Sequence, residues 1–165
     1  MSNSSYRRPI FDTLLARLNE PPSRLQIVSG PRQVGKTTVV RQALEAIDRP
    51  GHYASADDPA LRDPAWLEAQ WEVGRRLAES GAGGAVLAID EAQKVPGWAE
   101  IAKRLWDEDR AAGTPLRVVL LGSAALLVQR GLSESLAGRF ELIRAPHWSF
   151  AEMRDAFGFD LDRFI

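Results

Sequence analysis

The chain has 165 residues, of which 45% are hydrophobic and 26% are charged, and its formal net charge at pH 7 is −1. This length and composition predict one domain with a sizeable core, and the near-neutral charge gives no support for a nucleic-acid partner. The absence of cysteine excludes disulfides and cysteine-ligated zinc, and no apolar run reaches the length of a membrane span, so we expect a cytoplasmic protein with no membrane partner.

The first predicted elements are a short helix and a strand. Apolar residues recur with helical spacing from Phe11 to Leu18, and this stretch lies between Pro9, which suits a helix start, and Pro21, which stops the helix. Residues 25–29 form an apolar run that predicts the first strand.

A glycine-rich stretch follows this strand and leads into a predicted helix. Its residues are Gly30, Pro31, Arg32, Gln33, Val34, Gly35, Lys36, Thr37 and Thr38. The first eight fit the pattern G-x-x-x-x-G-K-[ST], in which the glycines let backbone N–H groups point at phosphate oxygens. Lys36 supplies a charge to the β and γ phosphates, and the Thr37 hydroxyl is placed to ligate Mg²⁺. A tight turn before a helix would explain the glycines but not the Lys-Thr pair, so we predict a phosphate-binding loop.

Helices and strands alternate along the rest of the chain. The predicted helices cover residues 36–47, 64–77, 98–112 and 124–129, and the further strands cover residues 52–55, 85–89, 116–121 and 140–145. Asp63 as N-cap and Pro64 at the first position mark one helix start, and Val73 is among the apolar positions of that helix. The alternation predicts an α/β fold with a parallel sheet and right-handed crossovers.

Two carboxylates follow the strand at residues 85–89. Asp90 stands where it can hold Mg²⁺, directly or through water, and Glu91 where it can orient or deprotonate the attacking water. Gln93 either steers that water or satisfies a turn, and we favour the turn. A solvated turn is the usual reading of such an acidic pair, but the phosphate-binding loop upstream favours a catalytic site.

The next strand and the last one each bring one more candidate. Ser123 follows the strand at residues 116–121, where it can contact the γ-phosphate or the attacking water, or cap the helix expected at Ala124. Arg139 precedes the last strand, where an arginine can contact the γ-phosphate of a nucleotide bound to a neighbouring subunit. An ordinary surface arginine is the alternative for Arg139, and Arg130 is a rival for the same task.

Four segments in this order and spacing resemble a known family. They read GPRQVGKTT, IDEAQKVPGW, LLGSAALL and SESLAGRFELI. The stretch from about Tyr6 to Phe150 resembles bacterial and archaeal P-loop ATPases of the AAA+ superfamily, in particular a predicted-ATPase family often fused to a C-terminal domain of unknown function. The resemblance implies a three-layer α/β/α fold with five parallel strands in the order 5-1-4-3-2.

The same resemblance implies ATP and Mg²⁺ as cofactors, the roles given above to the site residues, and a homo-oligomer if Arg139 acts between subunits. It divides the chain into an N-terminal tail and helix (1–20), an ATPase core (21–150) and the start of a C-terminal region (151–165). Such proteins normally continue into a helical lid and, in this family, an extra domain, whereas this chain stops at Ile165. We therefore expect an ATPase core separated from its output domain, with a protein partner that the sequence does not identify.

The leading functional hypothesis is ATP hydrolysis that drives or switches the missing domain. The alternative is a nucleotide-gated binding or signalling module with little hydrolysis. A small-molecule kinase fits the Asp-Glu pair and Arg139 less well, and the only asparagines, Asn3 and Asn19, do not provide the Asn-Lys-x-Asp sequence by which GTPases select their base.

Overall fold

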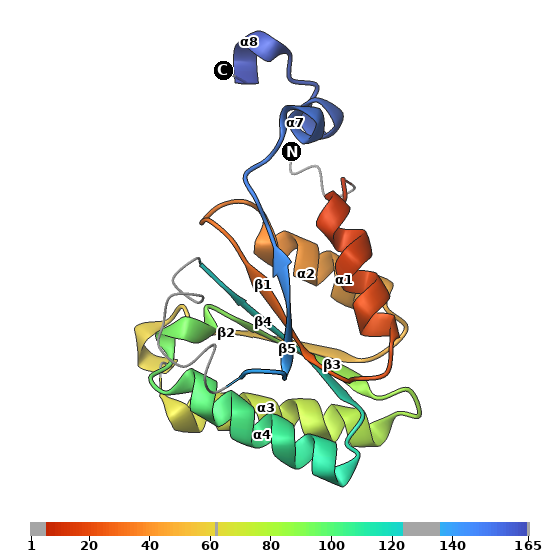
Figure 1. The fold of residues 1–165 in the computed structure, drawn as a ribbon, viewed down its shortest axis with the longest axis vertical. Helices are drawn as coiled ribbons and strands as arrows, with labels where there is room; N and C mark the ends of the chain where they lie inside the picture. Colours follow the sequence, from red (N-terminus) through yellow and green to blue (C-terminus); the bar gives the residue numbers. More distant parts are fainter. Residues whose placement is uncertain (1–5, 62, 124–135, 165) are drawn as a thin grey trace.

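The fold is a parallel sheet covered by helices on both faces. The computed structural model describes residues 6–61, 63–123 and 136–164. Its strands are β1 (Leu25–Ser29), β2 (Gly51–Ser55), β3 (Ala85–Asp90), β4 (Leu116–Gly122) and β5 (Phe140–Arg144). They pair in parallel in the order β2-β3-β4-β1-β5, which is the predicted order read from the other edge (Figure 1). The predicted three-layer fold is therefore confirmed.

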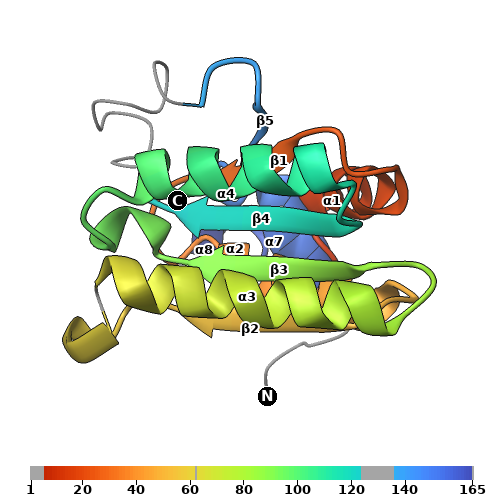
Figure 2. The same ribbon diagram turned by 90° about the horizontal axis from the view of Figure 1, so that it is seen from below.

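Helices cover both faces of this sheet, and those that follow β5 project beyond it (Figure 1). They are α1 (Pro9–Asn19), α2 (Lys36–Ala46), α3 (Pro64–Ser80), α4 (Trp98–Ala112), α7 (Phe150–Phe157) and α8 (Leu161–Phe164), with short 3₁₀ turns η1 (Pro59–Leu61) and η2 (Ala92–Lys94). Figure 2 shows α3 and α4 side by side over one face, while α1 and α2 cover the other (Figure 1). The helix expected at residues 124–129 lies outside the described residues.

The two faces of the central strands divide the core between them. In β3, Leu87 and Ile89 pack with the residues of α3 and α4, whereas Val86 and Ala88 pack with those of α1 and α2. All residues of β1, β3 and β4 are buried, because successive side chains alternate between two covered faces. The carboxyl ends of these strands therefore meet at one edge, and the loops that leave it form the site. Within the described part of the chain, no helix has both the length and the apolar character to cross a membrane.

Helix α3 begins as predicted and buries Leu67 and Trp71 as expected, but one of its predicted core positions is exposed. The Asp63 side chain accepts a hydrogen bond from the backbone N–H of Trp66 at 2.7 Å. Val73 is 36% exposed, so its expected place among the core positions is wrong, and Gly74 is buried in its stead. A Cβ on Gly74 would lie 3.2 Å from the Leu87 side chain and 3.3 Å from that of Leu116. The missing side chain lets α3 approach β3 and β4 closely, and this places the buried stripe one position beyond Val73.

A buried carboxylate links α3 to α4. Asp109 is 1% exposed, accepts a hydrogen bond from Trp71 Nε1 at 2.8 Å and pairs with Arg75 Nε at 2.7 Å. Removing one partner of such a group leaves the others buried without their charge or hydrogen bond. Asp109 and its two partners therefore hold α3 and α4 in register against the same face of the sheet.

Replacing Asp109 with alanine is expected to lower the free energy of unfolding by about 2 to 4 kcal/mol, because the buried Trp71 loses its acceptor and Arg75 is left with its hydrogen bonds to Glu108 and the Leu105 carbonyl. Urea unfolding monitored by circular dichroism measures this loss. Asp107→Ala is the matched control, since Asp107 lies on the same helix and pairs with Arg139 at the surface, where ion pairs contribute little. Equal losses in the two variants would contradict the structural role given to Asp109.

Candidate functional site

The glycine-rich loop connects β1 to α2 at the carboxyl edge of the sheet. Gly35 has φ +87°, a conformation that glycine adopts readily, and it directly precedes the first residue of α2. Gly30 is required for another reason, because a Cβ there would lie 2.0 Å from the carbonyl oxygen of Ala145. Gly35 thus shapes the loop, and Gly30 lets the loop pack closely against the segment that follows β5.

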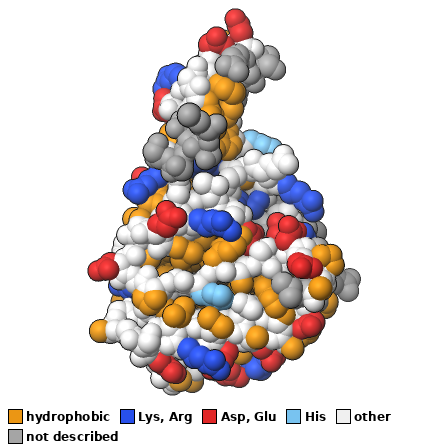
Figure 3. All heavy atoms as spheres, turned by 180° about the vertical axis from the view of Figure 1, so that it is seen from behind, with side chains coloured by type: hydrophobic (Ala, Val, Ile, Leu, Met, Phe, Trp, Pro, Cys, Tyr) orange, Lys and Arg blue, Asp and Glu red, His pale blue; other side chains and the backbone are white. Residues whose placement is uncertain are grey.

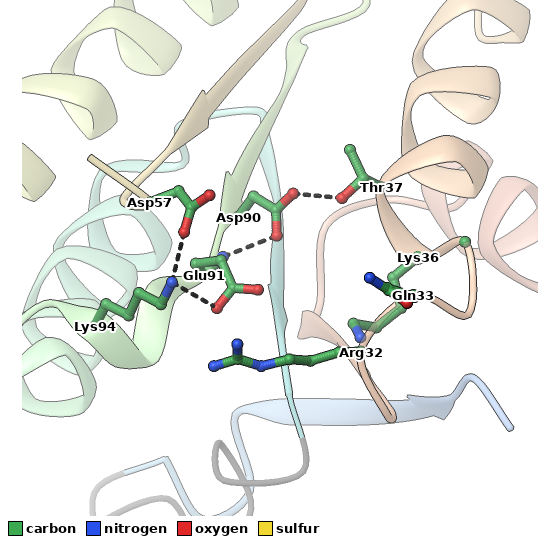
Figure 4. Close-up of a pocket in the computed structure, with 9 residues that line it drawn as sticks. Arg32, Gln33, Lys36, Thr37, Asp57, Asp90, Glu91 and Lys94 are labelled. Atoms are coloured by element: carbon green, nitrogen blue, oxygen red, sulfur yellow. Dashed lines mark hydrogen bonds and ion pairs between the residues drawn. The ribbon is translucent and has the colours of Figure 1, made fainter. Parts of the chain in front are cut away.

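A cavity of about 330 Å³ opens between this loop and the end of β3 (Figure 4). Its lining residues are Arg32, Gln33, Gly35, Lys36, Thr37, Asp57, Asp90, Glu91 and Lys94. The structure therefore brings together the predicted Lys36, Thr37, Asp90 and Glu91, although the sequence separates the loop from the acidic pair by some fifty residues. Three of the lining side chains are cationic and three are carboxylates, which suits a polyanionic ligand that is accompanied by a cation.

Lys36 lies beneath the loop and is only 7% exposed. Its Nζ donates hydrogen bonds to the carbonyl oxygens of Gly30 at 3.0 Å and Pro31 at 2.5 Å. Burial lowers the pKa of Lys36, and the nearby carboxylates of Glu91 and Asp90 oppose this shift only in part. A phosphate group bound in the cavity would add negative charge beside this ammonium and stabilise its charged form.

Thr37 and Asp90 place two oxygen atoms beside each other. Thr37 Oγ1 donates a hydrogen bond to Asp90 Oδ2 at 2.6 Å, and Oδ1 of the same carboxylate accepts the backbone N–H of Glu91 at 2.9 Å. Hydroxyl and carboxylate oxygens are the donors that Mg²⁺ prefers, usually completed by waters and substrate phosphates. The described residues contain no group of three or more His, Cys, Asp or Glu that could hold a metal ion alone. The donor pair thus fits Mg²⁺ that arrives with a nucleotide.

Glu91 faces the same cavity from a constrained backbone. Its φ of +55° is left-handed, which is uncommon for a residue with a side chain, and it precedes η2. The carboxylate accepts a hydrogen bond from Gln93 Nε2 at 2.7 Å and lies 3.6 Å from Lys94 Nζ. The side chain is thereby held at the cavity wall, where a proposed base would stand.

The Gln93 side chain lies close to both Glu91 and Ser123. The sequence favours a turn role for Gln93, whereas in the structure its Nε2 donates a hydrogen bond to Glu91 and lies 3.5 Å from Ser123 Oγ. Ser123 itself does not line the cavity, and its carbonyl accepts a hydrogen bond from Ser29 Oγ at 3.3 Å. Capping by Ser123 concerns a helix outside the described residues, so contact with nucleotide and capping both stay predictions.

Arg139 lies at the other end of the sheet from the cavity. It immediately precedes Phe140, which pairs with Leu25, the first residue of β1, whereas the phosphate loop follows the last. A five-residue strand separates the two ends by about 15 Å. The Arg139 guanidinium pairs with both carboxylate oxygens of Asp107, at 2.7 and 3.1 Å. Arg139 is therefore placed away from its own chain's cavity, and its rival Arg130 lies outside the described residues.

Two cavity residues were missed in the sequence analysis. Asp57 follows β2, and Lys94 Nζ lies 2.5 Å from Asp57 Oδ1 (Figure 4). Asp57 was within reach of sequence reasoning, because it leaves the same edge of the parallel sheet as Asp90. Lys94 comes three residues after Glu91, but that spacing alone does not say which way its side chain turns.

A second cavity, of about 530 Å³, adjoins the same loop. It is lined by Gln33, Val34, Gly35, His147, Trp148, Met153 and Phe157, so it shares Gln33 and Gly35 with the first. The rings of Trp148 and Phe157 lie 5.3 Å apart. Hydrophobic side chains are visible along the projecting C-terminal segment in Figure 3. This cavity is therefore more aromatic than the first, and the lining residues that the structure describes include no carboxylate.

Arg8 joins the N-terminal segment, the loop and α7. It is 3% exposed, and its guanidinium donates to the Val34 carbonyl at 2.6 Å, donates to the Pro146 carbonyl at 3.0 Å and pairs with Glu152 at 2.7 Å. Glu152 also completes a capping box with Ser149 at the start of α7. Parts of all three expected units of the chain, 1–20, 21–150 and 151–165, thus meet at the phosphate loop.

Comparison with known proteins adds a family and a fold. A family model described as an AAA domain matches residues 22–154. Uncharacterized proteins from Mycobacterium bovis and Mycobacterium tuberculosis are each 37% identical over 134 residues, which is 78% of this chain and 26% of theirs. The chain thus spans about a quarter of the length of these relatives. The structure of the Aeropyrum pernix ORC1 protein in complex with DNA matches with a TM-score of 0.61 and 17% identity, over 92% of this chain and 49% of that one.

Proposed function

We propose, from the premise that this chain belongs to the AAA domain family and has the nucleotide-binding core of a P-loop AAA+ ATPase, that it binds ATP with Mg²⁺ and hydrolyses it. The observation that carries the proposal is the single cavity that Lys36, the Thr37–Asp90 pair and Glu91 all face. Motion or signalling coupled to this hydrolysis would act on a C-terminal domain beyond the residues present here.

Each side chain has one task in the proposed reaction. Lys36 and the loop N–H groups bind the β and γ phosphates, and Thr37 with Asp90 would hold Mg²⁺, which neutralises charge that develops on the phosphates. Glu91 orients a water molecule and accepts its proton while the water oxygen bonds to the γ-phosphorus. The bond from that phosphorus to the ADP oxygen breaks, and ADP and inorganic phosphate leave.

A titration of the chain with a nonhydrolysable ATP analogue and with the matching GTP analogue tests nucleotide binding directly. Saturable binding of the ATP analogue that strengthens with Mg²⁺ is the expected result. Equal or tighter binding of the GTP analogue would contradict the choice of ATP, and no binding of either would contradict the proposal as a whole.

The nucleotide base is proposed to lie in the second cavity, with Trp148 as its main contact. Replacing Trp148 with alanine is expected to weaken ATP binding roughly 10- to 100-fold, since stacking of a base on an aromatic ring contributes about 1 to 3 kcal/mol. Calorimetric titration measures the change.

Tripolyphosphate is the matched control ligand for this variant, because it has the phosphates without the base. Trp148 Nε1 also donates to the Val34 carbonyl in the loop, at 3.1 Å, so the control separates an effect on the loop from an effect on the base site. An equal loss of affinity for tripolyphosphate would contradict the base contact.

One observation favours the alternative of a nucleotide-gated module with little hydrolysis. Arg139 is bound to Asp107 and does not line its own chain's cavity, so an arginine finger from this position would have to come from a second copy. In a homo-oligomer Arg139 would complete a neighbouring site, where such a residue increases turnover by roughly 10³ to 10⁵. ATP binding without turnover at every protein concentration would favour the nucleotide-gated module, whereas turnover that rises with protein concentration would favour an arginine finger from a second copy.

Nucleic acid is not part of the proposed function. The Aeropyrum pernix ORC1 protein was solved in complex with DNA, but 17% identity supports a shared fold and does not transfer a ligand. The formal net charge of −1 remains the argument from this chain itself, so the absence of a nucleic-acid partner stays a prediction.

A further inference from the structure

A tyrosine on the edge strand reaches the carboxylate at the centre of the site. Tyr53 lies in β2, opposite Ala88 of β3 in the parallel register. Asp90 comes two residues after Ala88, and the side chains of residues two apart in a strand share one face. The Tyr53 hydroxyl donates a hydrogen bond to Asp90 Oδ2 at 2.5 Å, although Tyr53 does not line the phosphate cavity.

The Asp90 carboxylate is held from three directions. Oδ2 accepts hydrogen bonds from both Thr37 Oγ1, at 2.6 Å, and Tyr53 Oη, and Oδ1 accepts the backbone N–H of Glu91 at 2.9 Å. Asp90 is only 5% exposed, so water has little access to replace a lost donor. These contacts come from α2, from β2 and from the backbone of the next residue, and they fix the plane of the carboxylate.

The tyrosine is itself held in place. Its ring packs against the core on the α1 and α2 face, and the Arg41 guanidinium lies 4.5 Å from the ring centroid. These contacts hold the ring where its hydroxyl donates to Asp90.

The Thr37 hydroxyl has two tasks in such a site, because it would bind the metal through a lone pair while its O–H still donates to Asp90. Tyr53 has no such second task. We propose that Tyr53 is a positioning residue, which holds the Asp90 carboxylate at the right place beside Thr37 to receive the Mg²⁺ of a bound nucleotide. This inference rests on the proposed binding of Mg²⁺ and ATP.

The test compares Tyr53→Phe with the wild-type chain for binding of Mn²⁺, a paramagnetic substitute for Mg²⁺. Electron paramagnetic resonance measures free Mn²⁺ in the presence of a saturating nonhydrolysable ATP analogue. We expect the Mn²⁺ dissociation constant to rise about tenfold in the variant, the lower end of the effect of removing a group that orients a metal ligand. Affinity for the analogue in EDTA is expected to stay unchanged, and in turnover assays the half-saturating Mg²⁺ concentration rises while kcat at saturating Mg²⁺ is kept.

Tyr6→Phe is the matched control, since it removes the hydroxyl of the other tyrosine in the chain and is expected to leave Mn²⁺ binding as in the wild type. Unchanged Mn²⁺ affinity in Tyr53→Phe would overturn the inference. So would an equal loss of analogue affinity in EDTA, because that would show a general disturbance of the site. If the wild-type chain binds no nucleotide, the proposed function itself fails, and this result is distinct from either outcome.

Discussion

A Lys36→Ala variant is expected to bind ATP about 100- to 1,000-fold more weakly than the wild type, with no detectable turnover. A charge 4 Å from a phosphate contributes roughly 4 kcal/mol at an effective dielectric constant of 20, and the cost of removing the ammonium from water lowers this value. Lys36 is largely buried beneath the loop, so another cation cannot easily take its place. Titration with a fluorescent ATP analogue measures the loss.

Lys103→Ala is the matched control, because Lys103 lies on α4 and does not line either nucleotide cavity. A Lys36→Ala variant that binds ATP as tightly as Lys103→Ala would contradict the role given to this residue.

Burial lowers the pKa of Lys36. As the pH rises, the ATP affinity of the wild type is therefore expected to fall at a lower pH than it would with a lysine of ordinary pKa.

A Glu91→Gln variant is expected to keep its affinity for ATP and to lose turnover by a factor of roughly 10² to 10⁴, the usual contribution of a general base. The amide has nearly the shape of the carboxylate and still offers an oxygen to Gln93, but it cannot accept the proton of the attacking water. Measurements of phosphate release and of ATP binding on the same preparation separate the two effects.

Glu79→Gln makes the same chemical change on the exposed side of α3 and should turn over ATP like the wild type. Wild-type turnover no faster than that of Glu91→Gln would contradict the assignment of a base and would favour the nucleotide-gated module. Loss of ATP binding in Glu91→Gln would instead show that the side chain supports the cavity.

Much of the fold could be read from local patterns. The phosphate loop, the buried strands and the cap at Asp63 each depend on residues close together in sequence, and the structure places all of them close to where we expected. Gly74 could not be read this way. Its burial depends on how closely α3 approaches β3 and β4, and a helical pattern containing Val73 did not reveal that approach.

The features of the site that the sequence did not predict are contacts between distant segments. Tyr53 of β2 contacts Asp90 of the adjacent strand β3, and Arg8 contacts Val34 in the loop and Glu152 in α7. Nothing in the spacing of these residues predicts such contacts, since they follow from the register of β2 on β3 and from the path of the chain after β5. The pairing of Arg139 with Asp107 of α4 likewise depends on how distant elements pack.

The central claim is that one cavity, between the loop and the end of β3, binds the phosphates and metal of ATP. A crystal structure with Mg²⁺ and a nonhydrolysable ATP analogue tests it most directly. We predict that the γ-phosphate contacts Lys36 Nζ, that the metal lies beside Thr37 and Asp90, and that a water molecule near the γ-phosphorus contacts Glu91. Phosphates bound elsewhere on the chain, or a metal distant from both Thr37 and Asp90, would contradict the account.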